Sequence, residues 1–228
     1  MRVFIGLIGL ALAGLAALTL SGRASSVAGL SSEVRVIDGD TFEMGEYRYR
    51  LLNMDAPEMG QTCRKANGAD WRCGEAAANA LRKLVSSARV ACDVDGTDAY
   101  GRRLAHCAAG GVDLGGALVE QGLAVAFLRY GDEYLDAEIA AMESRRGMWA
   151  GSFTRPAEFR SAKWRVGDQA APSKDCPIKG NINGEGERIY HTPFSRHYGR
   201  TEVSTARGER WFCTEAEAIA AGWRAPYF

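Results

Sequence analysis

The alternation of apolar and polar residues in the first half of the chain predicts a β-rich domain. Short apolar stretches at residues 34–37, 41–44 and 47–52 are separated by tight turns, which is typical of a three-stranded meander. Residues 90–94 and 103–108 have the same character and indicate two further strands. We therefore expect five short strands in this part of the chain.

Helical patterns surround the last two of these strands. Residues 73–89 carry apolar side chains on one helical face, and residues 134–146 are expected to form a later helix that stops at Gly147. Asp113 is expected to cap another helix, which ends near Gln121. A helix between the third and fourth of five strands predicts an α+β fold, namely a five-stranded OB-fold barrel with three helices.

The beginning of the chain has the pattern of a targeting segment. A positive start is followed by an apolar run at residues 3–20 and by small residues up to Ala24. This pattern predicts that residues 1–24 are a secretory signal peptide, cleaved after Ala24. An uncleaved membrane anchor is the alternative, because the run is just long enough to span a bilayer. Residues 25–32 are small and polar and are interpreted as a linker. In both cases the rest of the chain is expected to be exported, either secreted or periplasmic.

The cysteines agree with export. All six follow the apolar segment: Cys63, Cys73, Cys92, Cys107, Cys176 and Cys213. An even number of cysteines in an exported protein predicts disulfide bonds.

The second half of the chain divides into two parts. The predicted barrel covers residues 33–153, and residues 154–174 are polar without an apolar period, which indicates a linker. Residues 175–228 have their own cysteine pair and aromatic residues and are expected to form a small separate module. Cys176 and Cys213 could pair there, or they could bind zinc together with His191 and His197; an exported location favours the disulfide.

The net charge limits how the protein could hold a nucleic acid. The chain has 28 Lys and Arg against 28 Asp and Glu. Loss of residues 1–24 would remove Arg2 and Arg23, leaving 26 basic against 28 acidic residues and a net charge of −2. Proteins that grip duplex DNA along its backbone are usually basic. Any nucleic-acid binding must therefore come from a local positive cluster.

Charged residues at predicted strand ends form a candidate site. The carboxylates of Asp40 and Asp55 and the backbone carbonyl of Ala56 are hard oxygen donors, which suit Ca²⁺. Arg50 and Arg102 suit a phosphodiester, because a guanidinium holds two phosphate oxygens and stays charged at any working pH.

Glu58 is the candidate general base of this site, since a carboxylate near a metal-bound water can accept its proton. Each residue taken alone has a plainer interpretation. Asp38 and Asp40 could serve only the Asp-Gly turn, and a lone strand Arg or loop Glu is usually a surface residue. The hypothesis of a site depends on the joint spacing of these residues.

Four motifs in order resemble the staphylococcal nuclease (thermonuclease) family: residues 36–41 (VIDGDT), 50–58 (RLLNMDAPE), 74–77 (GEAA) and 98–105 (DAYGRRLA). The resemblance covers about residues 33–150. It implies an OB-fold and calcium-dependent cleavage of single-stranded or denatured DNA and RNA, with no stable protein partner. It also implies calcium ligation by Asp40, Asp55 and the Ala56 carbonyl, phosphate clamping by Arg50 and Arg102, and a general-base role for Glu58.

Two features depart from the family pattern. Ala56 stands where the staphylococcal enzyme has Thr, a change that a backbone carbonyl ligand survives. Residues 127–130 lack the paired tyrosines that seat a base, so only Tyr100 and Tyr130 are expected to stack on substrate.

The expected barrel also suggests cysteine pairs. Cys92 and Cys107 fall on adjacent antiparallel strands, and Cys63 and Cys73 flank the loop before the first helix, so each pair is expected to form a disulfide. The C-terminal stretch resembles a small module of bacterial extracytoplasmic proteins, which implies no chemistry.

Three hypotheses of function follow. The chain is an exported nuclease, a non-catalytic OB-fold protein that binds nucleic acid, or an envelope interaction protein in which the C-terminal module matters most. The complete set of two arginines, two aspartates and one glutamate favours the nuclease, because clustered like charges cost stability when they have no role.

Overall fold

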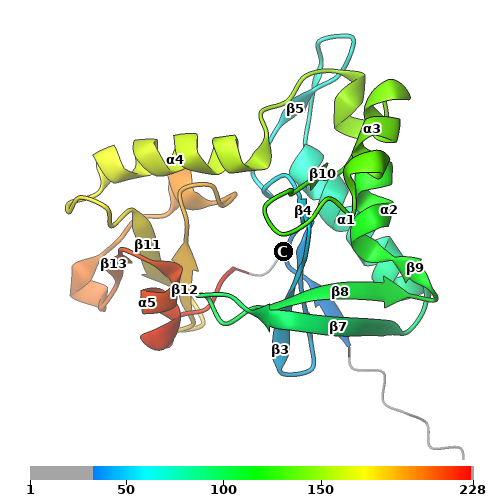
Figure 1. Cartoon of the computed structure of the whole chain (residues 1–228). Helices are drawn as coiled ribbons and strands as arrows, with labels where there is room; N and C mark the ends of the chain where they lie inside the picture. Colours follow the sequence, from blue (N-terminus) through cyan, green and yellow to red (C-terminus); the bar gives the residue numbers. More distant parts are fainter. Residues whose placement is uncertain (1–32, 227–228) are drawn as a thin grey trace, which may run out of the picture. The chain divides into compact units, whose positions relative to one another are not determined.

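The computed structural model describes residues 33–226 (Figure 1). The predicted signal peptide or anchor at residues 1–24 and the predicted linker at 25–32 lie outside the described residues. Within residues 33–226, no helix is both long enough and apolar enough to cross a membrane.

The predicted strands are confirmed. They are β1 (Val34–Val36), β2 (Thr41–Met44), β3 (Tyr47–Leu51), β7 (Val90–Thr97) and β8 (Arg103–Ala109). Their order in the sheet is β1-β2-β3-β8-β7, and a short strand β9 (Val112–Asp113) pairs with β8. β3 and β8 run parallel, whereas the other pairs are antiparallel. The sheet curls as Figure 1 shows, and this mixed, curled sheet with its helices agrees with the predicted OB-fold class.

Short strands extend the barrel where the sequence predicted loops. β4 (Met54–Asp55) pairs antiparallel with β10 (Val125–Ala126), so that Asp55 lies opposite Val125. β5 (Cys63–Arg64) and β6 (Asp70–Trp71) form a small hairpin before the first helix. Asp55 is thus held by a strand pair rather than by a free loop.

The three helices of the barrel domain also follow the prediction. They are α1 (Cys73–Ser87), α2 (Leu114–Glu120) and α3 (Leu135–Glu143), and a 3₁₀ turn η1 (Gly147–Ala150) follows them. The Asp113 side chain accepts a hydrogen bond from the Gly116 backbone N–H, which confirms the predicted cap of α2.

The core of this domain joins the sheet to the helices. Phe42 from β2, Leu81 from α1, and Leu114 and Leu118 from α2 are fully buried in one cluster. Each such side chain contributes about 1.5–3 kcal/mol through removal of apolar surface from water. The strand ends that carry the candidate site therefore extend from a packed core.

Residues 156–170 differ from the sequence prediction. We expected a linker over residues 154–174, but α4 (Pro156–Ala170) is a helix of 15 residues. Pro156 at the first helical position favours the start of a helix. The predicted conformation was wrong because α4 is held by contacts that leave no apolar period: an ion pair of Arg160, and Trp164 packed against the C-terminal core.

The C-terminal residues form a small sheet with a core of its own. Its elements are β11 (Ile178–Ile182), β12 (Arg188–His191), β13 (Arg210–Phe212), the helix α5 (Glu215–Ala220) and the 3₁₀ turns η2 (Tyr198–Arg200) and η3 (Thr205–Arg207). The strands are antiparallel in the order β12-β11-β13. Ile178, Tyr190, Phe212 and Trp223 fill its core. The exact domain boundaries stay predictions.

The expected disulfides are present: Cys63–Cys73, Cys92–Cys107 and Cys176–Cys213. Cys92 lies opposite Cys107 in the pairing of β7 with β8. Because Cys176 and Cys213 pair with each other, neither thiolate is available for the alternative zinc site. Three disulfides indicate that the protein folds in an oxidising compartment.

Candidate active site

Strand register brings the two predicted calcium ligands to one arginine. Arg50 on β3 lies opposite Thr41, the residue after Asp40, and Asp55 ends β4. A single nitrogen of Arg50, Nη2, lies 3.1 Å from Asp40 Oδ2 and 3.2 Å from Asp55 Oδ1. Asp40 and Asp55 are 5% and 2% exposed. The two carboxylates are therefore both buried and close to each other.

The loop that carries Glu58 is fixed by its backbone. The Gln61 backbone N–H donates to the Glu58 carbonyl at 2.7 Å, and Gln61 Oε1 accepts from the Glu58 N–H at 3.3 Å. The buried Gln61 amide also donates to the Thr154 carbonyl at 2.7 Å. Gly74 packs so closely that a Cβ there would lie 1.8 Å from the Glu58 carbonyl oxygen. Only glycine fits at this position, which the GEAA motif supplies.

Arg102 is positioned by the turn between β7 and β8. Asp98 accepts hydrogen bonds from the backbone N–H groups of Tyr100 at 2.9 Å and Arg102 at 3.0 Å. The same carboxylate accepts a bond from Arg102 Nε at 2.7 Å. Gly101 has a φ of 76°, a conformation that glycine adopts without strain. The Arg102 guanidinium carbon lies 5.1 Å from the centre of the Tyr100 ring.

Arg160 on α4 is a third arginine at these carboxylates. Its Nη1 lies 2.9 Å from Asp55 Oδ1, and its Nη2 lies 3.0 Å from Asp55 Oδ2. Nη1 also lies 2.9 Å from Glu58 Oε1. The guanidinium therefore holds Asp55 with both nitrogens and contacts the candidate base as well.

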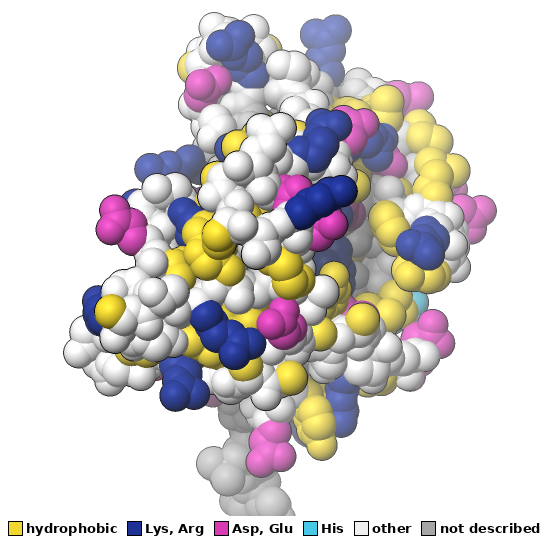
Figure 2. Space-filling view, turned by 90° about the vertical axis from the view of Figure 1, so that its left-hand side faces the viewer, with side chains coloured by type: hydrophobic (Ala, Val, Ile, Leu, Met, Phe, Trp, Pro, Cys, Tyr) yellow, Lys and Arg dark blue, Asp and Glu magenta, His cyan; other side chains and the backbone are white. Residues whose placement is uncertain are grey.

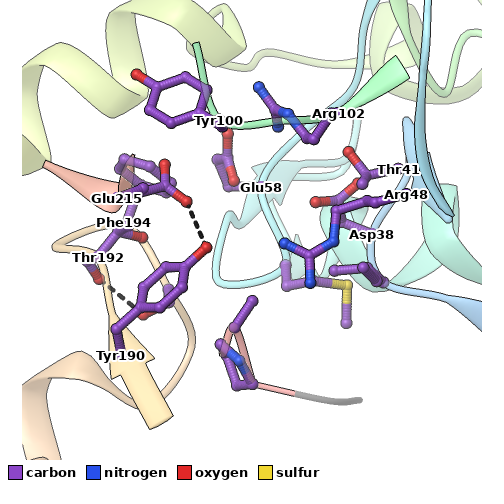
Figure 3. Close-up of a pocket in the computed structure, with 15 residues that line it drawn as sticks. Asp38, Thr41, Arg48, Glu58, Tyr100, Arg102, Tyr190, Thr192, Phe194 and Glu215 are labelled. Carbon is purple, nitrogen blue, oxygen red and sulfur yellow. Dashed lines mark hydrogen bonds between the residues drawn. The ribbon is translucent and has the colours of Figure 1, made fainter. Parts of the chain in front are cut away.

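Several of these residues, though not Asp55, line a cavity of about 230 Å³. Its wall includes Asp38, Asp40, Arg50, Glu58, Tyr100 and Arg102 from the barrel, and Arg160, Trp164, Phe194 and Glu215 from the C-terminal region. A second, smaller cavity shares much of this wall. Figure 3 shows Glu58, Tyr100 and Arg102 beside Phe194 and Glu215 there, and a hydrogen bond of 2.9 Å from Tyr190 to Glu215. The C-terminal region thus forms part of the wall.

The carboxyl groups of the cavity respond differently to their surroundings. Burial, with the negative charges of Asp40 and Glu58, raises the pKa of Asp38 well above its ordinary value. Burial acts on Asp40 as well, but the charges of Arg50 and Arg102 prevail and lower the pKa of Asp40. Burial raises the pKa of Glu58 to about 7, against the opposing charge of Arg160. A carboxyl with a pKa near neutrality can both take and release a proton.

The donor chemistry of this site fits a hard cation. Asp40 and Asp55 provide buried carboxylates that reach the same nitrogen, and Ala56 follows with its carbonyl. Within residues 33–226, however, no group of three or more Asp, Glu, His or Cys side chains is arranged to hold a metal. Both oxygens of Asp55 are engaged by arginines. The residues present therefore suit calcium by type, while Arg160 holds the carboxylate on which calcium would depend.

Comparison with known proteins identifies the family of this chain. The sequence model of the family described as staphylococcal nuclease homologue matches residues 48–151. The succinoglycan biosynthesis protein ExoI of Rhizobium meliloti (strain 1021) is 39% identical over 140 residues, which cover 59% of this chain and 72% of ExoI. Protein ParB of Escherichia coli is 33% identical over 146 residues, 58% of this chain and 76% of ParB. The chain belongs to the staphylococcal nuclease homologue family. A second family model, described as ArfC, matches residues 156–225.

Membership in the staphylococcal nuclease homologue family confirms the predicted resemblance and a nuclease-type fold. The structure brings Asp40, Arg50, Asp55 and Glu58 together, and Arg102 and Tyr100 line the same cavity. Tyr130 is elsewhere: it is 63% exposed, packs against Phe127 and is absent from the lining of this cavity. The two predicted stacking residues therefore occupy different surroundings.

Sequence reasoning missed four residues that shape the site. Asp38 and Asp98 stood inside the quoted motifs, so their hydrogen-bonding side chains could have been recognised. Gln61 carried no signal, since its role depends on the distant Thr154 carbonyl. Arg160 carried none either, because residues 156–170 were not recognised as a helix.

Proposed function

We propose that this protein is an exported, calcium-dependent phosphodiesterase that cleaves single-stranded or denatured DNA and RNA. The observation that carries the proposal is the convergence of acidic and basic side chains in one cavity of a nuclease-type fold. The acids there include Asp40 and Glu58, and the bases include Arg50 and Arg102, while Asp55 lies beside the cavity in contact with Arg50. The three disulfides support an exported location.

The arginines have the role of holding the phosphate. Within residues 33–226, the hydrogen bonds of Arg102 run through its Nε and its backbone N–H to Asp98, so Nη1 and Nη2 are available to a ligand in the cavity. Fixed positive groups aimed at the charge that develops on phosphate oxygens give a large share of catalysis. Arg50 adds a second positive group, already oriented by Asp40 and Asp55.

The carboxylates divide into metal ligands and a base. Asp40, Asp55 and the Ala56 carbonyl would hold calcium, which when bound makes a coordinated water easier to deprotonate and neutralises phosphate charge. Glu58 takes the proton of the attacking water. Its raised pKa suits this role near neutral pH, because the base must release the proton again.

Substrate grip in this proposal is local. The whole chain has a net charge of zero, and Figure 2 shows basic and acidic side chains interspersed over one face of the molecule. A single strand would be held by Arg50 and Arg102 at the phosphate and by base stacking on Tyr100, with Tyr130 as the second predicted platform. We therefore expect weak binding outside the site and a strong dependence on calcium.

The decisive experiment measures cleavage of denatured DNA and of RNA by residues 25–228, with calcium and with chelator. We expect cleavage only with calcium, and a fall in kcat of about 10²–10³-fold in Arg102→Ala, as for loss of one charge-stabilising donor. Arg89→Ala is the matched control, because Arg89 is exposed at the opposite end of β7. Cleavage that persists in chelator, or in Arg102→Ala at the level of Arg89→Ala, would refute the proposal. Strand binding without any product would instead favour a non-catalytic OB-fold binding protein.

A further inference from the structure

Arg160 contacts the carboxylate that calcium is expected to use as a ligand, and it also contacts the predicted base. It comes from α4, more than a hundred residues beyond the carboxylates that it contacts. It bonds both oxygens of Asp55, the predicted calcium ligand, and one oxygen of Glu58, the predicted base. No other arginine of the described residues joins these two carboxylates to each other.

The charge balance of the cavity explains why a cation is present there. Asp38, Asp40, Asp55 and Glu58 gather in or beside it, and buried like charges repel one another. Arg50 forms ion pairs with Asp40 and Asp55, whereas Arg102 forms its ion pair with Asp98. Among the described residues, Arg160 is the cation that pairs directly with Glu58. Arg50 and Arg160 thus offset part of the negative charge of these four carboxylates.

Calcium and Arg160 cannot both use Asp55 in this arrangement. Asp55 Oδ1 accepts from Arg50 and from Arg160, and Oδ2 accepts from Arg160. A divalent cation at these oxygens would lie beside a guanidinium of like charge at contact distance. Binding of the metal at both oxygens of Asp55 therefore requires that Arg160 withdraw, because among the described residues Arg160 contacts Oδ1 and Oδ2, whereas Arg50 contacts Oδ1 alone.

The helix that carries Arg160 is held firmly at both ends. Near its start, Arg155 Nη2 lies 2.8 Å from Glu138 Oε1 of α3. Near its end, Gly167 is buried so closely against Pro193 that a Cβ would lie 2.6 Å from Pro193 Cγ. Between them, Trp164 packs against the C-terminal core. The Arg160 side chain, attached through a flexible stem, can leave the carboxylates while α4 stays in place.

We propose that Arg160 is a built-in cation that occupies the metal site of the calcium-free protein and must be displaced before calcium binds. The proposal rests on the assignment of Asp40 and Asp55 as calcium ligands in the proposed function. It gives the C-terminal region a role in the nuclease site: α4 sets the calcium concentration at which Asp55 and Glu58 become available. In the calcium-bound protein, Glu58 is free to accept a proton.

A calorimetric titration with calcium alone tests the proposal. Three forms of residues 25–228 are compared: wild type, Arg160→Gln and Arg165→Ala. Arg165 lies on the same helix and is exposed, so its variant has the same charge change without the contacts. We expect Arg160→Gln to bind calcium at least about tenfold more tightly than wild type, which corresponds to about 1.4 kcal/mol, and Arg165→Ala to match wild type. Equal affinity of Arg160→Gln and wild type would overturn the proposal.

A second measurement uses wild type, so its result does not depend on whether Arg160→Gln folds correctly. The Nε–H resonance of Arg160 in wild type, assigned by its loss in the folded Arg160→Lys variant, should shift and broaden as calcium is added. A resonance that is unchanged at saturating calcium would contradict displacement. The Lys variant keeps the charge but loses the two-pronged contact, so its calcium affinity should lie between those of wild type and Arg160→Gln.

The same titrations separate this inference from the proposed function. Tighter calcium binding by Arg160→Gln with no cleavage by any form would support displacement and refute the nuclease. Calcium-dependent cleavage, with equal calcium affinities of wild type and Arg160→Gln, would support the nuclease and refute displacement. Loss of cleavage by Arg160→Gln at saturating calcium, with unchanged affinity, would identify Arg160 as a phosphate clamp and overturn its role as a built-in cation.

Discussion

The barrel and the C-terminal region both contribute charged side chains to one cavity, but they hold them in different ways. Asp40, Arg50 and Asp55 belong to paired strands, and Arg102 follows a turn whose backbone N–H groups are bonded to Asp98. Arg160 reaches the cavity from a helix and is held there by ion pairs of its side chain. The barrel groups are therefore fixed by the backbone, whereas the Arg160 guanidinium can move without unfolding any element.

The charged groups of the barrel are therefore preorganised, whereas the contacts of Arg160 can be exchanged. Groups held by a rigid backbone need no reorganisation when charge develops on a substrate. Loss of the Arg160 ion pairs would leave the buried carboxylates of Asp55 and Glu58 without this partner, so the guanidinium can leave them when another cation takes its place. The next three predictions test whether damage to the barrel affects catalysis while damage to the C-terminal region affects stability and access.

The largest expected effects on the free energy of unfolding come from loss of one disulfide in the barrel or one in the C-terminal region. In the chain-entropy description, loss of Cys63–Cys73, which spans 10 residues, costs on the order of 3 kcal/mol, and loss of Cys176–Cys213, which spans 37, about 4 kcal/mol. Unfolding in guanidinium chloride measures both losses of stability.

We also expect the Cys63→Ser/Cys73→Ser variant to lose activity at saturating calcium, because that bridge closes the loop beside Glu58. A greater loss of activity in Cys176→Ser/Cys213→Ser would contradict the comparison.

A change at Asp98 should affect catalysis next most strongly. Asp98→Ala removes the acceptor of two backbone N–H groups and of Arg102 Nε, so the guanidinium loses its position. Misplacement of a catalytic group by about 1 Å can cost about 10²-fold in rate, and we expect a fall in kcat of this order.

Conservative replacement sharpens this prediction. Asp98→Asn keeps an oxygen for the backbone N–H groups and should recover part of the rate, whereas exposed Asp95→Ala should behave as wild type. Calcium affinity measured by calorimetry should stay unchanged in all three variants. Reduced calcium affinity in Asp98→Ala would show that the turn supports the metal site rather than the phosphate clamp.

The smallest expected effect is a dependence of stability on pH in the C-terminal region. Burial, reinforced by the charges of His197, Lys179 and Arg200, lowers the pKa of His191 from 6.5 to about 4. Between these two values the unfolded chain binds more protons at His191 than the folded chain does. Stability should therefore fall as the pH falls from about 6.5 to about 4.

Thermal unfolding at a series of pH values measures this effect. His191→Gln keeps an oxygen and a nitrogen near Asn181, the hydrogen-bond partner of the imidazole, and should flatten the pH dependence in this window. The midpoint of this variant should change less between pH 6.5 and pH 4 than that of wild type. An equal slope in both proteins would show that the dependence arises from other groups, such as the carboxylates of the barrel.

The barrel and most of its site could be predicted from the sequence, because local patterns encode them. The strand pattern and the Asp113 cap need only neighbouring residues, and both were confirmed. Asp40, Arg50, Asp55 and Glu58 lie within nineteen residues, from 40 to 58, so strand register alone brings them together. The roles of these residues stay predictions until activity and calcium binding are measured.

The placement of α4 could not be predicted in the same way. Its contacts alternate between an ion pair at Arg160, an aromatic ring at Trp164 and a tight backbone approach at Gly167, and these produce no hydrophobic period. Helix stability in such a segment comes mainly from packing against the rest of the fold. Polar composition alone therefore suggested a linker.

The sequence by itself determined the positions of the strands along the chain and the charged residues at their ends, because each depends on spacing along the chain, and the expected barrel then suggested two of the cysteine pairs. Only the tertiary structure decided that Arg160 contacts two of the same carboxylates, Asp55 and Glu58. A contact between residues 55 and 160 depends on how two separate cores pack, and side-chain charges attract whichever partner that packing brings within reach.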